Sequence, residues 1–356
     1  MIVLPTLVFL AYLVTGRQIN SIANAKQTYD TRKLNYKAEF APIEDQLNHT
    51  MMIDYINNLN TSWKAGYNFH PNISKYELKS LMGVNPDYRR HLQLPKQHSI
   101  LSTNSTMPAE FDSCQAWPEC QELISMIHDT GLCGSDWAVA TASAFSDRLC
   151  IASKGTIVRN LSAEDLSCCH FCGHKCEGGS PELAWRYLMT DGIVTGGSYQ
   201  SKEGCKPYTI YPIRGYGQLP PQNIMGYMSA GICERKCQEE YAKDLLSDLY
   251  YAECIYSLRR NTHMRDIYNN GPVIATVKVY EDFMYYRSGI YQYTTGEQLG
   301  GHAVKIIGWG VENGVKYWLC VNSWGSSWGE NGFFKIKRGN NECGIEERFN
   351  AGIPKV

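Results

Sequence analysis

The sequence predicts an α+β protein in which a helical, cysteine-rich region precedes a strand-rich region. The stretch Trp137–Ile151 is dense in small and apolar residues and is followed by Gly155, so it predicts one buried helix. Apolar and polar residues alternate, as in strands, over residues 272–279, 302–308 and 316–322. All fourteen cysteines follow residue 113, which predicts a separate segment ahead of the cysteine-rich body.

Composition favours a folded protein of the secretory pathway. The chain has 356 residues, 44% of them hydrophobic, which is enough for sizeable cores. Its net charge of −1 gives no indication of a nucleic-acid or acidic-membrane partner. Fourteen cysteines favour an oxidising compartment, so we expect a secreted, extracellular or lysosomal protein. We also expect a monomer without a cofactor.

An apolar run, Ile2–Val14, stands near the start of the chain and is followed by Thr15 and Gly16. It is shorter than the roughly 18 residues of a membrane span, which favours a signal peptide at residues 1–16 over a retained anchor. After its removal we expect no membrane attachment. Five N-x-[ST] sequons agree with secretory passage and are the predicted glycosylation sites: Asn48, Asn60, Asn72, Asn104 and Asn160.

Residues 17–107 are polar, lack cysteine and hold four of the five sequons, which predicts a propeptide. The stretch Asn60–Phe69 resembles the N-T-x-W-x-A-G-x-N-F segment of cathepsin B propeptides. The resemblance implies that this segment packs on the mature domain and that the propeptide occupies the substrate groove and inhibits the zymogen. The alternative is that Trp63 and Phe69 belong to a small helical domain. With a propeptide ending at residue 107, the peptidase domain spans residues 108–356.

The octapeptide Thr130–Trp137 resembles the loop that carries the reactive cysteine of papain and cathepsin enzymes. Asp136 stands where that family has its nucleophile, and Thr130 stands where it has the oxyanion-hole glutamine. Ser135 and Asp136 suit a helix N-terminus, whose N–H groups favour an acceptor or a negative charge. A carboxylate is a poor nucleophile toward an amide, and loss of one oxyanion donor costs about 3 kcal/mol of transition-state stabilisation.

Two later motifs resemble the histidine and asparagine motifs of the papain family: Gly300-Gly301-His302 and Asn322-Ser323-Trp324. The resemblance implies that His302 carries the charge opposite the nucleophile and protonates the leaving amine. It also implies that Asn322 orients the imidazole and that Trp324 shields their hydrogen bond from water. The chain is therefore similar to cathepsin B-like members of the papain family. That fold has two lobes, a helical left domain and a β-barrel-like right domain.

The same resemblance implies five disulfides: Cys120–Cys150, Cys133–Cys176, Cys168–Cys233, Cys169–Cys172 and Cys205–Cys237. It leaves four cysteines unassigned: Cys114, Cys254, Cys320 and Cys343. The stretch 169–176 could be mistaken for a zinc knuckle, but an exported chain favours disulfides over a metal. We therefore expect no metal site.

Several features bear on the substrate groove. Gly178 and Gly179 match the glycine wall with which the family binds substrate backbone. Arg348 aligns with an acidic residue of the second specificity subsite, so the substrate preference of the family does not carry over. The segment Tyr211–Tyr227 matches the occluding loop of cathepsin B but has neither cysteine nor histidine. These glycines, Arg348 and Trp324 are the candidate substrate-binding residues.

We expect Asp136 and His302 to form an ion pair across the cleft, because an opposite charge favours the protonated ring. The alternative is that Asp136 caps its helix and faces solvent.

The function that these features favour is that of a pseudoprotease. Such a protein would bind peptides, inhibitors or its own propeptide in a retained groove without hydrolysing them. One alternative is a working cysteine-type endopeptidase with an unconventional nucleophile. Another is a secreted matrix or structural protein, although related matrix proteins carry an extra cysteine-rich module that the cysteine-free front of this chain lacks.

Overall fold

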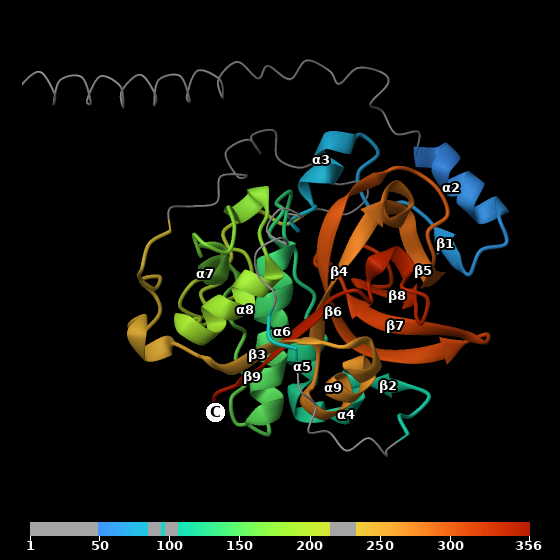
Figure 1. The fold of residues 1–356 in the computed structure, drawn as a ribbon. Coiled ribbons are helices and arrows are strands. Elements are labelled where there is room, and N and C mark those ends of the chain that lie inside the picture. The colour runs from blue at the N-terminus through green and yellow to red at the C-terminus, as the bar shows by residue number, and fades with distance from the viewer. Residues whose placement is uncertain (1–48, 85–93, 97–105, 214–232) are drawn as a thin grey trace, which may run out of the picture. The chain divides into compact units, whose positions relative to one another are not determined.

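The computed structural model describes residues 49–84, 94–96, 106–213 and 233–356, which form an α+β fold (Figure 1). The predicted signal peptide, residues 1–16, and the sequons at Asn48 and Asn104 lie outside the described residues. Among the described helices, none is long and apolar enough to cross a membrane.

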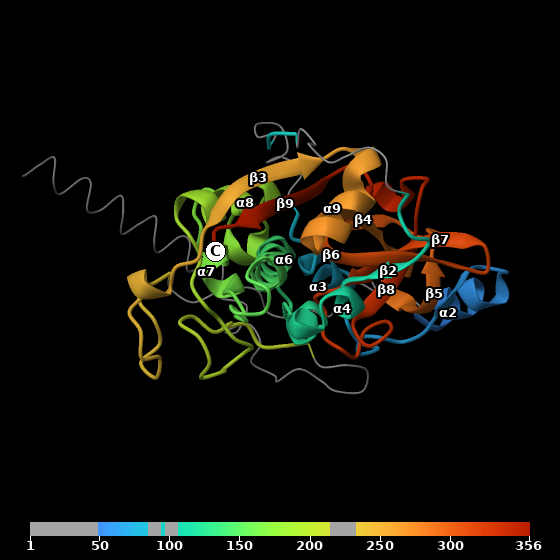
Figure 2. The same cartoon turned by 90° about the horizontal axis from the view of Figure 1, so that it is seen from below.

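The helices α6, α7 and α8 lie on one side of the fold and the strands β4 to β8 on the other (Figures 1 and 2). The helices are α2 (His49–Asn58), α3 (Lys75–Ser80), α4 (Ser113–Ala116), α5 (Gln121–Ile124), α6 (Asp136–Ala152), α7 (Ala163–Ser167), α8 (Pro181–Thr190) and α9 (His263–Asn270). The strands are β1 (Trp63–Ala65), β2 (Phe111–Asp112), β3 (Ala252–Leu258), β4 (Val273–Tyr280), β5 (Tyr286–Tyr291), β6 (Gln298–Glu312), β7 (Val315–Val321), β8 (Phe333–Lys337) and β9 (Phe349–Pro354). The predicted helix is confirmed as α6, and the predicted strands as β4, β6 and β7.

The described strands join in the order β1-β5-β8-β7-β6-β4-β9-β3, with β2 paired to β6. The β5–β8 pair is parallel, whereas β6 is antiparallel to both β4 and β7. β6 carries His302 opposite Val277 of β4. The backbone ladders on both sides of β6 therefore fix the position of His302 along the sheet.

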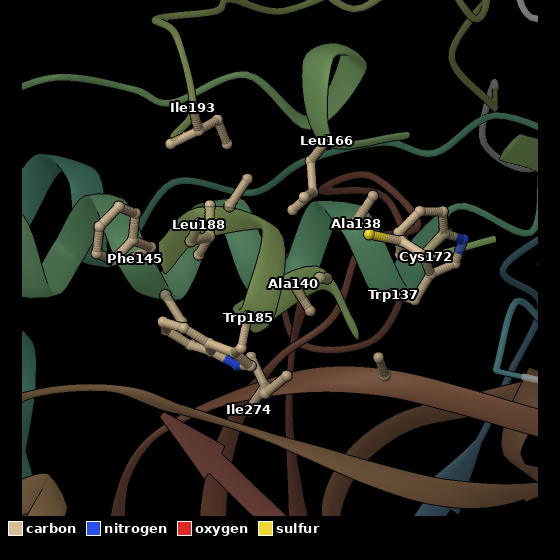
Figure 3. Packing of buried hydrophobic residues seen from close by; sticks show 14 of the residues in the cluster. Trp137, Ala138, Ala140, Phe145, Leu166, Cys172, Trp185, Leu188, Ile193 and Ile274 are labelled. Carbon is tan, nitrogen blue, oxygen red and sulfur yellow. The ribbon is translucent and has the colours of Figure 1, made fainter. Parts of the chain in front are cut away.

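Helix α6 is buried along nearly its whole length, because its small residues let neighbouring elements approach closely. The core around it includes Trp137, Phe145, Leu166, Trp185 and Ile274 (Figure 3). Phe145 of α6 meets Trp185 of α8 edge to face, with 5.9 Å between the ring centroids. This packing holds α6 against its neighbours along its length.

Residues 49–84 pack on the later strands rather than forming a helical domain of their own. β1 pairs with β5, and the indole of Trp63 is buried with its Nε1 donating to the Gln292 carbonyl at 3.0 Å. Phe69 is buried as well. The small-domain interpretation of Trp63 and Phe69 is therefore wrong, and the expected packing of Asn60–Phe69 on the rest of the chain is confirmed.

Candidate active site

Asp136 is the first residue of α6, and its side chain has no exposed surface. The interpretation of Asp136 as a solvent-facing cap is therefore wrong. Ser135, which precedes the helix, does not cap it through its side chain either. Its Oγ lies 2.6 Å from the hydroxyl of Tyr208, so a buried hydrogen bond between these two side chains replaces the expected cap.

His302 lies between Asp136 and Asn322. Its Nδ1 is 2.5 Å from Asp136 Oδ2, and its Nε2 is 2.8 Å from Asn322 Oδ1. The amide oxygen of Asn322 also accepts the N–H of Ser323 at 2.8 Å, which fixes its orientation. Both ring nitrogens of His302 therefore face a side-chain oxygen that can accept a hydrogen bond. Helix α6, strand β6 and the residue after β7 thus meet in one buried contact.

The indole of Trp324 lies beside this histidine in a tilted arrangement. The two ring centroids are 4.6 Å apart at an interplanar angle of 36°, and both side chains are buried. Phe69 of the N-terminal segment approaches the same indole, with 6.1 Å between the centroids. The aromatic cover keeps water from the His302–Asn322 hydrogen bond, which strengthens it.

Thr130 is buried, and its hydroxyl donates to the carbonyl oxygen of Ser323 at 3.1 Å. The same carbonyl accepts the backbone N–H of Thr130 at 2.9 Å. Thr130 thus ties the loop before α6 to the Asn322–Trp324 segment. The neighbouring Asp129 accepts the backbone N–H of Gly131 at 2.9 Å, and burial raises its pKa to about 6.

The segment Met82–Val84 passes between the two walls of the site. The N–H of Gly83 donates to Asp136 Oδ2 at 2.8 Å, and the carbonyl of Gly83 accepts the N–H of Gly179 at 2.8 Å. Val84 N–H donates to the carbonyl of Gly301 at 3.1 Å. A Cβ at Gly178 would lie 2.8 Å from the Gly83 carbonyl oxygen. The structure therefore brings Gly178 and Gly179 together with Asp136 and His302 around a stretch of extended backbone.

Arg348 takes part in a different contact. Its Nη1 lies 3.4 Å from Glu182 Oε1 at the start of α8, and the Arg348 side chain is partly exposed. It joins none of the contacts described above. Of the segment Tyr211–Tyr227, residues 214–227 lie outside the described residues.

Five disulfides connect the cysteines in the pairs that the resemblance implies: Cys120–Cys150, Cys133–Cys176, Cys168–Cys233, Cys169–Cys172 and Cys205–Cys237. The Cys133–Cys176 bond, with a backbone hydrogen bond from Gly134 to Cys176 of 3.1 Å, ties the loop before α6 to the Gly178–Gly179 wall. The cysteines of the zinc-knuckle alternative are thus held in disulfides. Free thiols remain at Cys114, Cys254, Cys320 and Cys343.

Two separate parts of the chain match family models. The model described as "Papain family cysteine protease" matches residues 107–353. The chain belongs to the papain family of cysteine proteases. The model "Peptidase family C1 propeptide" matches residues 50–88, so a family propeptide precedes the peptidase-like region.

Individual relatives place the chain with cathepsin B-like members of the papain family. "Cathepsin B-like cysteine proteinase 4" of Caenorhabditis elegans is 43% identical over 312 residues, which are 85% of this chain and 91% of that protein. "Cathepsin B-like cysteine proteinase 1" of Ostertagia ostertagi is 47% identical over 261 residues, 72% of this chain and 76% of that protein. The solved structure "proCathepsin B S9 from Trypanosoma congolense" superposes with a TM-score of 0.74 at 36% identity, covering 88% of this chain and all 100% of that one. The expected papain-like α+β fold with its propeptide is therefore confirmed.

The residue that meets Asp136 from the N-terminal segment carries no motif in the sequence. Gly83 contacts a residue 53 positions later, a separation that no local pattern reveals. The signal available was a lone glycine within the run Leu81–Val84, because a glycine inside an extended stretch marks a close approach of two backbones. Tyr208, which holds Ser135, gave no signal in the sequence.

Proposed function

We propose that this cathepsin B-like homologue binds peptides in its groove without hydrolysing them. The observation that carries the proposal is the buried Asp136 carboxylate facing His302, where the resemblance places the family's nucleophile. A carboxylate attacks an amide poorly, and the acyl anhydride that it would form is unstable. The nearby Cys133 cannot replace it, because its sulfur is bonded to Cys176.

The position of Thr130 supports the same conclusion. Thr130 stands where the family has its oxyanion glutamine, and its hydroxyl donates to the Ser323 carbonyl rather than to a substrate oxygen. Loss of one such donor costs about 3 kcal/mol of transition-state stabilisation. The contacts among His302, Asn322 and Trp324 remain, so the substitutions would remove the nucleophile and its oxyanion donor while the surrounding frame persists.

The walls of the groove support retained binding. The N–H of Gly179 and the carbonyl of Gly301 hold extended backbone from either side. A peptide substrate, an inhibitor or the chain's own propeptide would use the same groups. Arg348, held by Glu182, is the candidate for selecting a ligand side chain, and its positive charge would favour an acidic one.

We infer the processing of the chain from the same resemblance. Residues 1–16 form a signal peptide, residues 17–107 a propeptide and residues 108–356 the peptidase-like domain of a secreted or lysosomal protein. Asn60 and Asn72 are exposed and Asn160 is partly exposed, so these sequons are accessible to glycosylation.

The experiment that tests this function restores the missing groups. The natural protein, Asp136→Cys and Asp136→Cys/Thr130→Gln are treated alike with an added protease that removes the residues before 108. Each is then assayed on a fluorogenic dipeptide amide. We expect the natural form to be inert and Asp136→Cys to cleave slowly. The double variant should cleave roughly 100-fold faster than Asp136→Cys, because one oxyanion-hole donor changes the rate by about that factor.

A matched control separates this activity from a contaminant: adding His302→Ala to the double variant should abolish cleavage. Hydrolysis by the natural protein that disappears in Asp136→Ala would show a working peptidase with an unconventional nucleophile. If none of the variants cleaves, the groove is not competent, and the proposal of a retained groove fails.

A further inference from the structure

We propose that Asp136 is a ligand-binding residue whose carboxylate accepts a backbone N–H from an extended peptide and selects glycine at that position. This inference rests on the proposed groove-binding function and specifies its ligand. The resident ligand in the structure is the chain's own segment Met82–Val84. In this role Asp136 does more than replace the nucleophile of the family, because it also provides a contact for the bound peptide.

The contact is that of a charge-assisted hydrogen bond. Gly83 N–H donates to Asp136 Oδ2 at 2.8 Å, and His302 Nδ1 shares the same oxygen. Asp136 has no exposed surface, and a buried carboxylate is costly unless donors surround it. Gly83 and His302 both contact Oδ2, and the positive end of the α6 dipole lies at the same place, whereas Oδ1 is buried without a hydrogen-bond partner among the described residues. Hydrogen bonds to an ionised oxygen are the stronger kind.

Backbone pairing with both walls of the groove sets the register of the ligand relative to Asp136. Val84 forms a parallel bridge with Gly179 and an antiparallel bridge with Gly301. Hydrogen bonds from Gly179 to Gly83 and from Val84 to Gly301 measure 2.8 and 3.1 Å. The ligand backbone is therefore extended between two walls, as in strand addition, and in this register the N–H of Gly83 points at Asp136.

The space beside that N–H admits no side chain. A Cβ on Gly83 would lie 2.2 Å from the carbonyl oxygen of Gly134 and 2.8 Å from Asp136 Oδ1. The first neighbour is backbone, so a rotamer change cannot relieve the clash. Gly83 is not among the glycines with positive φ, so its backbone conformation does not require glycine. The site selects glycine through lack of room.

The walls of the groove also lack side chains where the ligand backbone approaches, because glycines stand there. A Cβ on Gly134 would lie 3.1 Å from the Cα of Gly83, and a Cβ on Gly300 would lie 2.6 Å from the Cβ of Met82. Glycines on both walls thus let the ligand backbone approach Asp136 closely. The ligand class is an extended peptide with glycine in register with Asp136.

Hydrogen exchange in the full-length protein tests the inference. In Asp136→Ala the Gly83 amide should exchange roughly 10- to 100-fold faster, which is the effect of losing one hydrogen bond to a charged group. Asp136→Asn, which keeps an oxygen acceptor but not the charge, should give a smaller increase in the same direction. Amides of β1 should keep their natural rates and so report that residues 49–84 stay docked. Ser135→Ala is the matched control, because Ser135 bonds to Tyr208.

A second variant tests the glycine rule. In Gly83→Ala the segment should leave the groove, and the Gly179 amide, which bonds to the Gly83 carbonyl, should lose its protection. Natural exchange of Gly83 in both Asp136 variants would overturn the role of Asp136. Natural protection of Gly179 in Gly83→Ala would overturn the glycine rule. Neither readout involves cleavage, so these failures are distinct from the outcomes that refute the proposed function, which are all read from the cleavage assay.

Discussion

His302 and Asp136 form a contact closed to solvent, with 2.5 Å between Nδ1 and Oδ2 and no exposed surface on either side chain. Burial of two such groups costs desolvation energy, which their attraction offsets only while both are present. Asn322 provides a further acceptor for the ring, and Gly83 a further donor for the carboxylate. The contact thus joins α6 to β6 and couples the contributions of the two residues to stability.

We predict that Asp136→Ala and His302→Ala each lower the free energy of unfolding by about 3 to 5 kcal/mol, because each leaves a buried partner unsatisfied. The double substitution should cost less than the sum, since it leaves neither partner unsatisfied. Urea denaturation with the disulfides intact measures all three values. Lys236→Gln, in the exposed Lys236–Glu234 pair, is the control and should have no measurable effect. Additive losses at Asp136 and His302 would contradict the coupling.

The elements around the site were predictable where a local pattern determines them. Small apolar residues over Trp137–Ile151 predict a buried helix, and α6 covers that stretch. Alternation over residues 302–308 predicts a strand, and β6 contains it. The family motifs also identify positions 136, 302 and 322 as the positions of the candidate site. Each of these inferences needs only a short window of sequence or a family motif.

The hydrogen bonds that close the site from solvent could not be predicted from a local pattern. The Gly83–Asp136 hydrogen bond joins residues from separate elements, and the Ser135–Tyr208 hydrogen bond spans 73 positions. The burial of Asp136 goes with these contacts, so the sequence left the exposed cap open as the alternative to the expected Asp136–His302 ion pair. Tertiary packing overrides the preference of Ser and Asp for solvent-exposed helix caps.

Asn68 anchors the N-terminal segment to the sheet through both ends of its amide. Its Nδ2 donates to the carbonyls of Met284 and Tyr286 at 2.9 and 2.8 Å, and its Oδ1 accepts from Gly329 N–H at 3.2 Å. Asn68→Ala should lower the free energy of unfolding by about 3 kcal/mol, because buried backbone groups lose their partners. Limited proteolysis should then cut within residues 49–84 faster.

The control for this anchor is Asn58→Ala, an exposed asparagine at the end of α2. Its proteolysis rate should match that of the natural protein. Equal rates in Asn68→Ala and Asn58→Ala would show that Asn68 does not hold the segment.

Arg148 is a fully buried cation in the middle of α6, and its pKa is raised above the ordinary value despite the opposing effect of burial. Its guanidinium pairs with Asp266 and donates to the Pro272 carbonyl at 2.6 Å. We predict that Arg148→Met costs about 3 to 5 kcal/mol, because Asp266 becomes an uncompensated buried charge. Arg148→Met/Asp266→Leu should be more stable than the single variant, as measured by urea denaturation. A double variant less stable than Arg148→Met would contradict this account.

Asp282 makes the stability of the fold depend on pH, with a contribution that decreases as the pH rises. Burial raises its pKa to about 6, against hydrogen bonds from Tyr291 OH at 2.6 Å and Thr294 N–H at 2.7 Å that lower it. The folded state therefore keeps a proton that the unfolded chain, with a carboxyl pKa near 3.8, releases. The contribution of Asp282 to stability is present below about pH 4 and is lost as the pH rises to about 6, by about 2 to 3 kcal/mol. Between pH 4 and 7 the unfolding free energy of the natural protein should fall by this amount relative to that of Asp282→Asn. The difference between the two proteins should therefore change across the range. The exposed Asp54→Asn should parallel the natural profile, and a constant difference between natural protein and Asp282→Asn across that range would contradict the assignment.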